Sequence, residues 1–295
     1  ANGAAHRHGS LVVELADVDL WWTHDLGEPA LYDVTVELLR SQEVIDTATS
    51  RTGLRTIELD RSADDAQPGR LFRFLLNGVP TFARGANLVP MSMMRGSVPA
   101  THARTLVQRS AMAQMTMIRV WGGGHYEQDA FYEACDEYGV LVWQDFMFAC
   151  IDYPSSEVDL QAETLAEADY QVRRLRRHPS VAVWCGNNEV HGIHHAVYGE
   201  TGPGDWGWHL FHALLPDVVG RLSPGTPYWP GSPYADRGAG AVDDGHNGVN
   251  DGDRHAWEVW HGMDLGVGGQ TTFETPGEAM HFHRYAADTG RFISE

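Results

Sequence analysis

The sequence predicts an α/β protein whose main part is a (β/α)8 barrel of the TIM type. From about residue 70 onward, short apolar segments alternate with helical ones. Polar and aromatic residues gather where the apolar segments end, which is where a barrel builds its active site. The glycines of Gly122-Gly123-Gly124 lack the third-position glycine of a Rossmann turn, which disfavours a doubly wound sheet.

The first part of the chain has a different pattern. Apolar and polar residues alternate in 11–15, 31–38 and 54–59, and polar, Gly-containing or Pro-containing segments separate these stretches. Such alternation is typical of antiparallel strands. We therefore expect residues 1–66 to form part of a small immunoglobulin-like β-sandwich. The polar stretch 64–70 predicts the boundary, so residues 67–295 are assigned to the catalytic barrel.

The barrel elements follow in order after a hairpin turn predicted at Asn77-Gly78. The predicted strands are 81–87, 117–121, 140–146, 181–187, 228–232, 257–260 and 291–294. The predicted helices are 102–114, 129–138, 160–177, 206–222 and 276–287. Seven strands are placed, and an eighth needs residues after Glu295. We expect the barrel to lack its final strand and the helices that flank it.

Charge and composition limit the partners. The net charge of −19, from 40 acidic and 21 basic residues, repels phosphate backbones, so no nucleic acid is expected. No apolar run reaches the length of about 18 residues that a membrane-spanning helix needs. Three cysteines without a Cys-x-x-Cys pair indicate buried thiols. They leave the compartment open, with the cytoplasm favoured over secretion, and the oligomeric state also stays open.

The segment most informative for chemistry is the apolar run 181–186, which ends in Asn187, Asn188 and Glu189. Burying such polar groups is costly unless they serve a function. A carboxylic acid at a barrel rim, walled by Trp184 and other aromatic rings, is expected to have a raised pKa and to protonate a leaving oxygen. The alternative is an exposed glutamate that starts a helix.

The stretch Trp184 to Glu189 resembles the acid/base signature of β-mannosidases in glycoside hydrolase family 2. Further segments are similar to that family in the same order, namely 76–87, 119–124, 142–149 and 255–262. The resemblance implies a retaining hydrolase that removes β-linked mannose from non-reducing ends, with Glu189 as acid/base. It also implies that Glu295, in a Phe-x-Ser-Glu sequence, is the nucleophile; spacing alone makes Glu295 merely a terminal residue.

Two carboxylates suffice for this chemistry, so no cofactor is expected. A retaining pair lies about 5–5.5 Å apart and an inverting pair roughly 6.5–9.5 Å apart. The substrate is expected to be a β-mannoside or a manno-oligosaccharide. The resemblance implies that Asn188 binds the sugar 2-hydroxyl, although a backbone-capping role is the alternative. Trp121 is expected to form the floor of the sugar subsite, or else to be a tryptophan of the barrel core.

Further contacts are expected at other strand ends. Asp145 either positions an arginine or the substrate, or forms a buried pair with Arg119. Trp229, His255 and Trp257 are predicted as additional substrate contacts. Three histidines follow Glu189 without forming a His-Glu-x-x-His motif, so no metal is predicted.

Two other readings of the function stay open. A related exo-glycosidase, such as a β-galactosidase, β-glucuronidase or exo-β-glucosaminidase, has the same barrel and the same two glutamates. A non-catalytic carbohydrate-binding fragment is the second. Family members are much longer than 295 residues. We therefore expect a fragment that starts inside the sandwich and has an incomplete active site.

Overall fold

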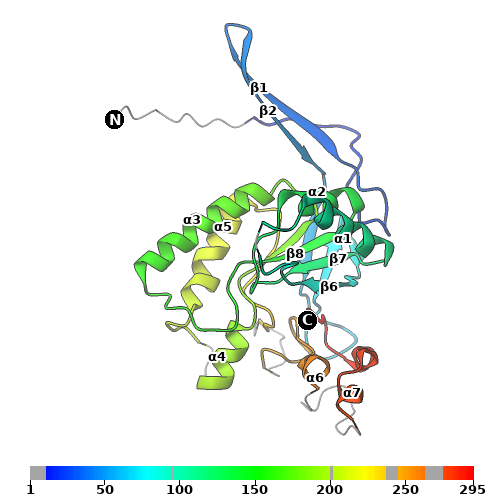
Figure 1. The fold of residues 1–295 in the computed structure, drawn as a ribbon, viewed down its shortest axis with the longest axis vertical. Coiled ribbons are helices and arrows are strands. Elements are labelled where there is room, and N and C mark those ends of the chain that lie inside the picture. Colours follow the sequence, from blue (N-terminus) through cyan, green and yellow to red (C-terminus); the bar gives the residue numbers. More distant parts are fainter. Residues whose placement is uncertain (1–10, 95, 200–201, 237–244, 263–274) are drawn as a thin grey trace.

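The computed structural model describes residues 11–94, 96–199, 202–236, 245–262 and 275–295. Its central element is a parallel five-stranded sheet in the order β10-β9-β8-β7-β6 (Figure 1). The strands are β6 (Gly85–Leu88), β7 (Met117–Val120), β8 (Leu141–Asp145), β9 (Val181–Cys185) and β10 (Tyr228–Trp229). Each strand lies beside its predecessor, as in a barrel wall, and the order does not reverse as in a doubly wound sheet.

Helices connect these strands, as the alternating sequence pattern predicted. They are α1 (Ala100–Met112), α2 (Asp129–Tyr138), α3 (Val158–Leu175), α4 (Val190–Tyr198) and α5 (Leu215–Leu222), the last preceded by the π-helical turn η1 (Leu210–Leu214). The helix predicted at 206–222 therefore begins four residues late. None of the described helices combines the length and the apolar character needed to cross a bilayer.

The two faces of the parallel sheet pack into different cores because successive side chains of a strand point to opposite faces. Ile118 and Val142 join the core beneath the helices, together with buried residues of α2, α3 and α5. Met117 and Leu141, one position earlier in their strands, join a second core with Phe74. Burying each such apolar side chain contributes about 1.5–3 kcal/mol.

The second core is covered by an antiparallel sheet of β3 (Ile57–Asp60), β4 (Arg73–Leu76) and β5 (Val79–Thr81). Asn77 and Gly78 connect β4 to β5 with positive φ angles of 50° and 79°, which confirms the predicted hairpin. The strand predicted at 81–87 is thus divided between β5 and β6. Strand β3 pairs with β4 across the polar stretch where the sequence predicted a domain boundary.

Strands β1 (Tyr32–Arg40) and β2 (Glu43–Thr52) form an antiparallel ribbon that projects from the rest of the molecule (Figure 1). This confirms the strand predicted at 31–38. Most residues of both strands are exposed, so the ribbon has no core of its own. The strand predicted at 11–15 is wrong, because this exposed segment pairs with no strand among the described residues.

The C-terminal part departs most from the predicted pattern. The strand predicted at 257–260 is instead the short helix α6 (Trp257–Trp260). Neighbouring Glu258 and Val259 are both buried, which a half-buried strand does not allow, and Arg254 pairs with Glu258 at helical spacing. Residues 291–294 contribute only an isolated bridge between Ile293 and Arg254. The helix predicted at 276–287 is divided into α7 (Pro276–Ala279) and the 3-10 helix η2 (Phe282–Ala287).

Candidate active site

Polar side chains from four successive strands meet at the carboxyl end of the parallel sheet. Arg119 lies within β7 and Asp145 ends β8. Asn188 follows β9 and Ser232 follows β10, and a parallel bridge joins these two residues beyond the regular strands. The sheet therefore continues into the segments that carry the predicted site, at the end where parallel sheets bind their ligands.

Glu189 leaves the end of the sheet in a constrained conformation. Its φ of 62° lies in the left-handed region, and its backbone N–H donates to the carbonyl of Ser232 at 2.7 Å. Such a conformation costs a non-glycine residue about 1–3 kcal/mol and is frequent at functional sites. Gly186 allows the close approach before it, because an added Cβ atom would lie 2.2 Å from the Pro230 carbonyl oxygen. The Asn187 side chain then accepts from Val190 N–H at the start of α4.

The Glu189 carboxylate is held by three donors. Oε1 accepts from His255 Nδ1 at 3.0 Å and from the Trp257 indole at 2.6 Å, and Oε2 accepts from Cys150 Sγ at 3.5 Å. Burial raises the pKa of Glu189, but hydrogen bonding to His255, its charge and the other donors lower the pKa to about 2. The predicted raised pKa is therefore wrong. Trp184, the expected apolar wall, points into the core beneath the helices instead.

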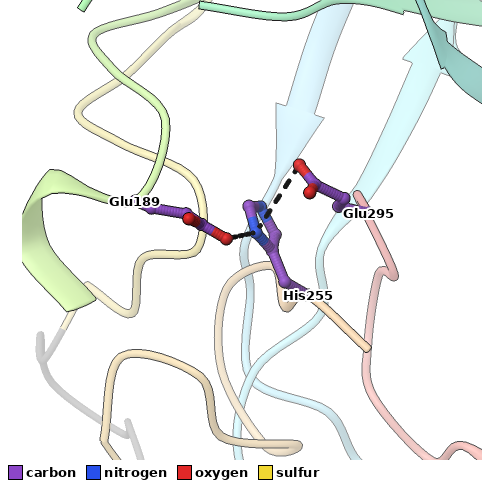
Figure 2. A group of neighbouring side chains, drawn as sticks. All are labelled: Glu189, His255 and Glu295. Atoms are coloured by element: carbon purple, nitrogen blue, oxygen red, sulfur yellow. Dashed lines mark hydrogen bonds and ion pairs between the residues drawn. The ribbon is translucent and has the colours of Figure 1, made fainter. Parts of the chain in front are cut away.

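His255 lies between the two predicted catalytic carboxylates (Figure 2). Its Nδ1 atom is 3.7 Å from Glu295 Oε2, and one ligating atom from each of Glu189, His255 and Glu295 lies within 4.8 Å of the others. Within the described part of the chain, this is the group with metal-ligand spacing, and the three histidines after Glu189 do not form another. All three side chains are already engaged by protein donors or acceptors, so their geometry is explained without an ion.

Arg119 holds the predicted nucleophile. Its NH1 atom donates to Glu295 Oε2 at 3.0 Å, while Glu295 keeps 22% of its side chain exposed. The same guanidinium is buried against Asp145, through NH2 to Oδ2 at 2.9 Å. Burial lowers the pKa of Arg119, yet Asp145 and Glu295 raise it above its ordinary value, so the residue is a permanent cation. Glu295 is thereby oriented by a fixed positive charge.

In the structure Asp145 forms the buried ion pair with Arg119, which was one of the two roles that the sequence allowed. Its carboxylate also accepts from the Trp143 indole at 2.8 Å and from Gly122 N–H at 2.9 Å. Arg119 NH2 donates to Asn188 Oδ1 at 2.8 Å as well. The sequence predicted Arg119 only as a possible partner of Asp145, and its contacts with Glu295 and Asn188 were missed. A charged residue inside the apolar strand β7 was the signal that could have indicated them.

Two predicted aromatic contacts are placed differently. Trp229 is buried in the second core, where its ring packs on Phe72 and its indole N–H donates to Asp253 at 2.6 Å. Trp229 therefore does not line the space between the carboxylates. Trp121 directly follows β7 and is half-buried, and its ring lies so close to Gly123 that an added Cβ atom would come within 2.0 Å.

Comparison with known proteins assigns the chain to a family. Residues 2–55 match the model of glycosyl hydrolases family 2. β-Mannosidase B of Aspergillus oryzae is 39% identical over 264 residues, which cover 86% of this chain and 30% of that protein. The crystal structure of β-D-mannosidase from Dictyoglomus thermophilum is 39% identical with a TM-score of 0.80, covering 93% of this chain and 31% of that one. The chain belongs to glycosyl hydrolases family 2.

This assignment confirms the predicted family resemblance. The chain spans about 30% of the length of the curated relatives that it matches. An exo-chitosanase from Amycolatopsis orientalis, 21% identical with a TM-score of 0.60 over 78% of this chain and 25% of that one, shares the fold. The fold of this part of the chain therefore also occurs in a protein of quite different sequence.

Proposed function

We propose that the protein is a retaining glycoside hydrolase that removes β-linked mannose from non-reducing ends, with Glu295 as nucleophile and Glu189 as acid/base. The observation that carries this proposal is the approach of the two carboxylates, which each place one oxygen within 4.8 Å of the other. This separation fits a retaining pair, at about 5–5.5 Å, and not an inverting pair, at roughly 6.5–9.5 Å.

The two steps use the geometry as follows. Glu295, held by Arg119, attacks the anomeric carbon while the bond to the leaving oxygen breaks, and Glu189 protonates that oxygen. In the second step Glu189 removes a proton from water, and the water oxygen attacks the anomeric carbon from the face that the leaving group vacated, so that the bond to Glu295 on the opposite face breaks. Two displacements restore the original configuration. The protein supplies every group that these steps require.

Mannose is the sugar that the relatives favour, since both the Aspergillus and the Dictyoglomus proteins are named β-mannosidases. Asn188 is suited to the 2-hydroxyl. Its Oδ1 atom accepts from Arg119, and its Nδ2 atom donates one hydrogen to Cys150 Sγ at 3.5 Å, which leaves the second hydrogen for the sugar. We propose that Nδ2 donates to the sugar there, and that Trp121 stacks on the apolar face of the pyranose. A neutral glycoside also suits a chain of net charge −19.

We further propose that residues 67–295 belong to a (β/α)8 barrel and that residues 1–66 belong to a β-sandwich unit. The sequential order of the five parallel strands supports the barrel. The family model, which matches residues 2–55, supports a separate N-terminal unit.

The test is a panel of 4-nitrophenyl β-glycosides assayed with the full natural protein that carries this sequence. We expect kcat/KM for the mannoside to exceed that for the galactoside, glucuronide and glucosaminide at least tenfold, and NMR to detect the β-anomer as the first product. The double variant E189Q/E295Q is the control for contaminating activity. Preference for another sugar overturns the substrate, an α-anomer overturns the mechanism, and binding without turnover indicates a carbohydrate-binding protein.

A further inference from the structure

A chain of buried hydrogen bonds leads away from Glu189 through His255. The His255 side chain has no exposed surface, and its two nitrogens contact different partners. Nδ1 faces Glu189 Oε1 at 3.0 Å, and Nε2 faces Ser232 Oγ at 2.9 Å. Ser232 Oγ in turn lies 2.6 Å from Oδ2 of the buried Asp253. The chain therefore joins a second buried carboxylate to the acid/base through one hydroxyl and one imidazole.

Asp253 acts as an acceptor in this chain. Four neutral donors contact its carboxylate: the Trp229 indole at 2.6 Å, Tyr234 N–H at 3.1 Å, Ser232 Oγ at 2.6 Å and Ser294 Oγ at 2.5 Å. The single hydroxyl hydrogen of Ser232 is thus directed at Asp253. Because that hydrogen is committed, the Ser232 oxygen accepts from His255 Nε2 at 2.9 Å, which places a hydrogen on Nε2. Arg119 NH1 could donate only to an Nε2 without a hydrogen, and its contact with Nε2 is much longer, at 3.5 Å.

It follows that Nδ1 is the nitrogen at which His255 gains or loses a proton. This atom faces the carboxylates of Glu189 and Glu295, which favour a positive imidazolium. Arg119 opposes it, with NH1 at 3.5 Å from Nε2. On the remaining side, α6 presents the neutral indole of Trp257, which donates to the same Glu189 oxygen. The two carboxylates together outweigh the single guanidinium, so the surrounding charge favours one proton held between His255 Nδ1 and Glu189 Oε1.

We propose that the proton used in acid catalysis is shared between His255 Nδ1 and Glu189, and that Asp253, acting through Ser232, is a positioning residue that maintains this sharing. The inference rests on the proposed function. In the first step the proton passes from Nδ1 to Glu189 and then to the leaving oxygen, while Glu295 bonds to the anomeric carbon and His255 becomes neutral. In the second step the proton taken from water returns to Nδ1, and the bond to Glu295 breaks.

This arrangement explains how a carboxylate that is ionised at neutral pH serves as an acid. With the pKa of about 2 that His255 and the other donors give it, Glu189 holds almost no proton there. A coupled pair loses its proton at a macroscopic pKa that belongs to the pair. The basic limb of the kcat/KM profile should therefore report the His255–Glu189 pair, and replacing His255 should move this limb to lower pH.

The experiment measures pH profiles of kcat/KM with the full natural protein and whichever sugar of the panel is hydrolysed best. For an alkyl glycoside, we expect H255N to move the basic limb down by about one pH unit or more. We expect S232A and D253N to move it in the same direction by roughly half a unit. With a 2,4-dinitrophenyl leaving group, which needs no protonation, the limb should stay in place. D136N is the matched control, since Asp136 and His178 form another buried carboxylate–imidazole pair.

An unchanged limb in H255N overturns the shared proton, and an equal shift with the dinitrophenyl glycoside or in D136N assigns the effect to general structural damage. A second readout does not depend on turnover. In ¹⁵N-histidine NMR at neutral pH, the Nδ1–H signal of His255 should be present in wild type and weakened in E189Q, because the Glu189 carboxylate accepts that hydrogen. A signal that does not depend on Glu189 overturns the inference, whereas an inactive wild-type protein whose signal does depend on Glu189 overturns only the proposed function.

Discussion

Replacing Arg119 by methionine tests the centre of the site. Arg119 is 4% exposed and its partner Asp145 is fully buried, so the guanidinium balances a charge that water cannot reach. In R119M, Asp145 keeps only the neutral N–H groups of Trp143 and Gly122. Breaking a buried pair by removing one partner costs about 3–5 kcal/mol. The variant should therefore lose much of the stability of an ordinary domain.

This loss of unfolding free energy should appear as a lower melting temperature. With an unfolding entropy of about 2.1 cal/mol/K per residue, 3–5 kcal/mol in a chain of 295 residues corresponds to a decrease of roughly 5–8 °C. Differential scanning calorimetry on the full natural protein measures it. R173M is the matched control, because Arg173 forms an exposed i,i+4 pair with Asp169 that contributes little to stability. That control should melt within about 2 °C of wild type.

The same substitution should lower kcat/KM by about 10²-fold, since Glu295 loses the cation that orients it. The double variant R119M/D145N removes the buried charge together with its partner. It should recover part of the lost melting temperature without recovering activity. A melting temperature of R119M within 2 °C of wild type would refute the argument from buried charge, and full activity would refute the assigned contact with the nucleophile.

Three further predictions concern the segment that carries the acid/base. E189Q should slow hydrolysis of alkyl glycosides by about 10³-fold and of dinitrophenyl glycosides by less than tenfold, and equal losses would contradict the assigned role. Because the pKa of Glu189 falls from 4.5 to about 2, its ionised form stabilises the fold above pH 4.5 by up to about 3 kcal/mol. The melting difference between wild type and E189Q should therefore shrink as pH falls from 5 to 2; a constant difference would contradict the lowered pKa. G186A should lose both stability and activity because its Cβ atom meets the Pro230 carbonyl, whereas G220A, which has open space, should melt like wild type.

The elements that the sequence predicted best have a strong local pattern. Helix α2 occupies the predicted residues 129–138, and strands β7, β8 and β9 lie within the predicted segments. Buried parallel strands are apolar throughout, so short runs bounded by polar residues identify them. Residues 257–260 were predicted as a strand because three of the four are apolar or aromatic. The burial of the two neighbours Glu258 and Val259, which only the structure shows, distinguishes the helix.

For the site, the sequence identified groups by type and missed what they contact. The residues after β9 were found because amides and a carboxylate end an apolar strand. The pKa of Glu189 was predicted in the wrong direction, since the imidazole that lowers it comes from a segment 66 residues away. His255 and Trp257 were predicted as contacts of the substrate. The structure places both directly on Glu189, where they act on its carboxylate.

The contacts between site residues could have been predicted from the sequence where those residues stand at the ends of neighbouring strands, and not elsewhere. In a sheet whose strands follow one another in sequence order, residues at successive strand ends must be neighbours. Arg119, Asp145, Asn188 and Ser232 stand on four such ends, so their contacts follow once β7 to β10 are placed. His255 has no such anchor, because it lies outside the regular strands, in a segment that only isolated backbone hydrogen bonds join to residues 292–295. The residue that lies between the two proposed catalytic carboxylates is therefore the one whose place required the full structure.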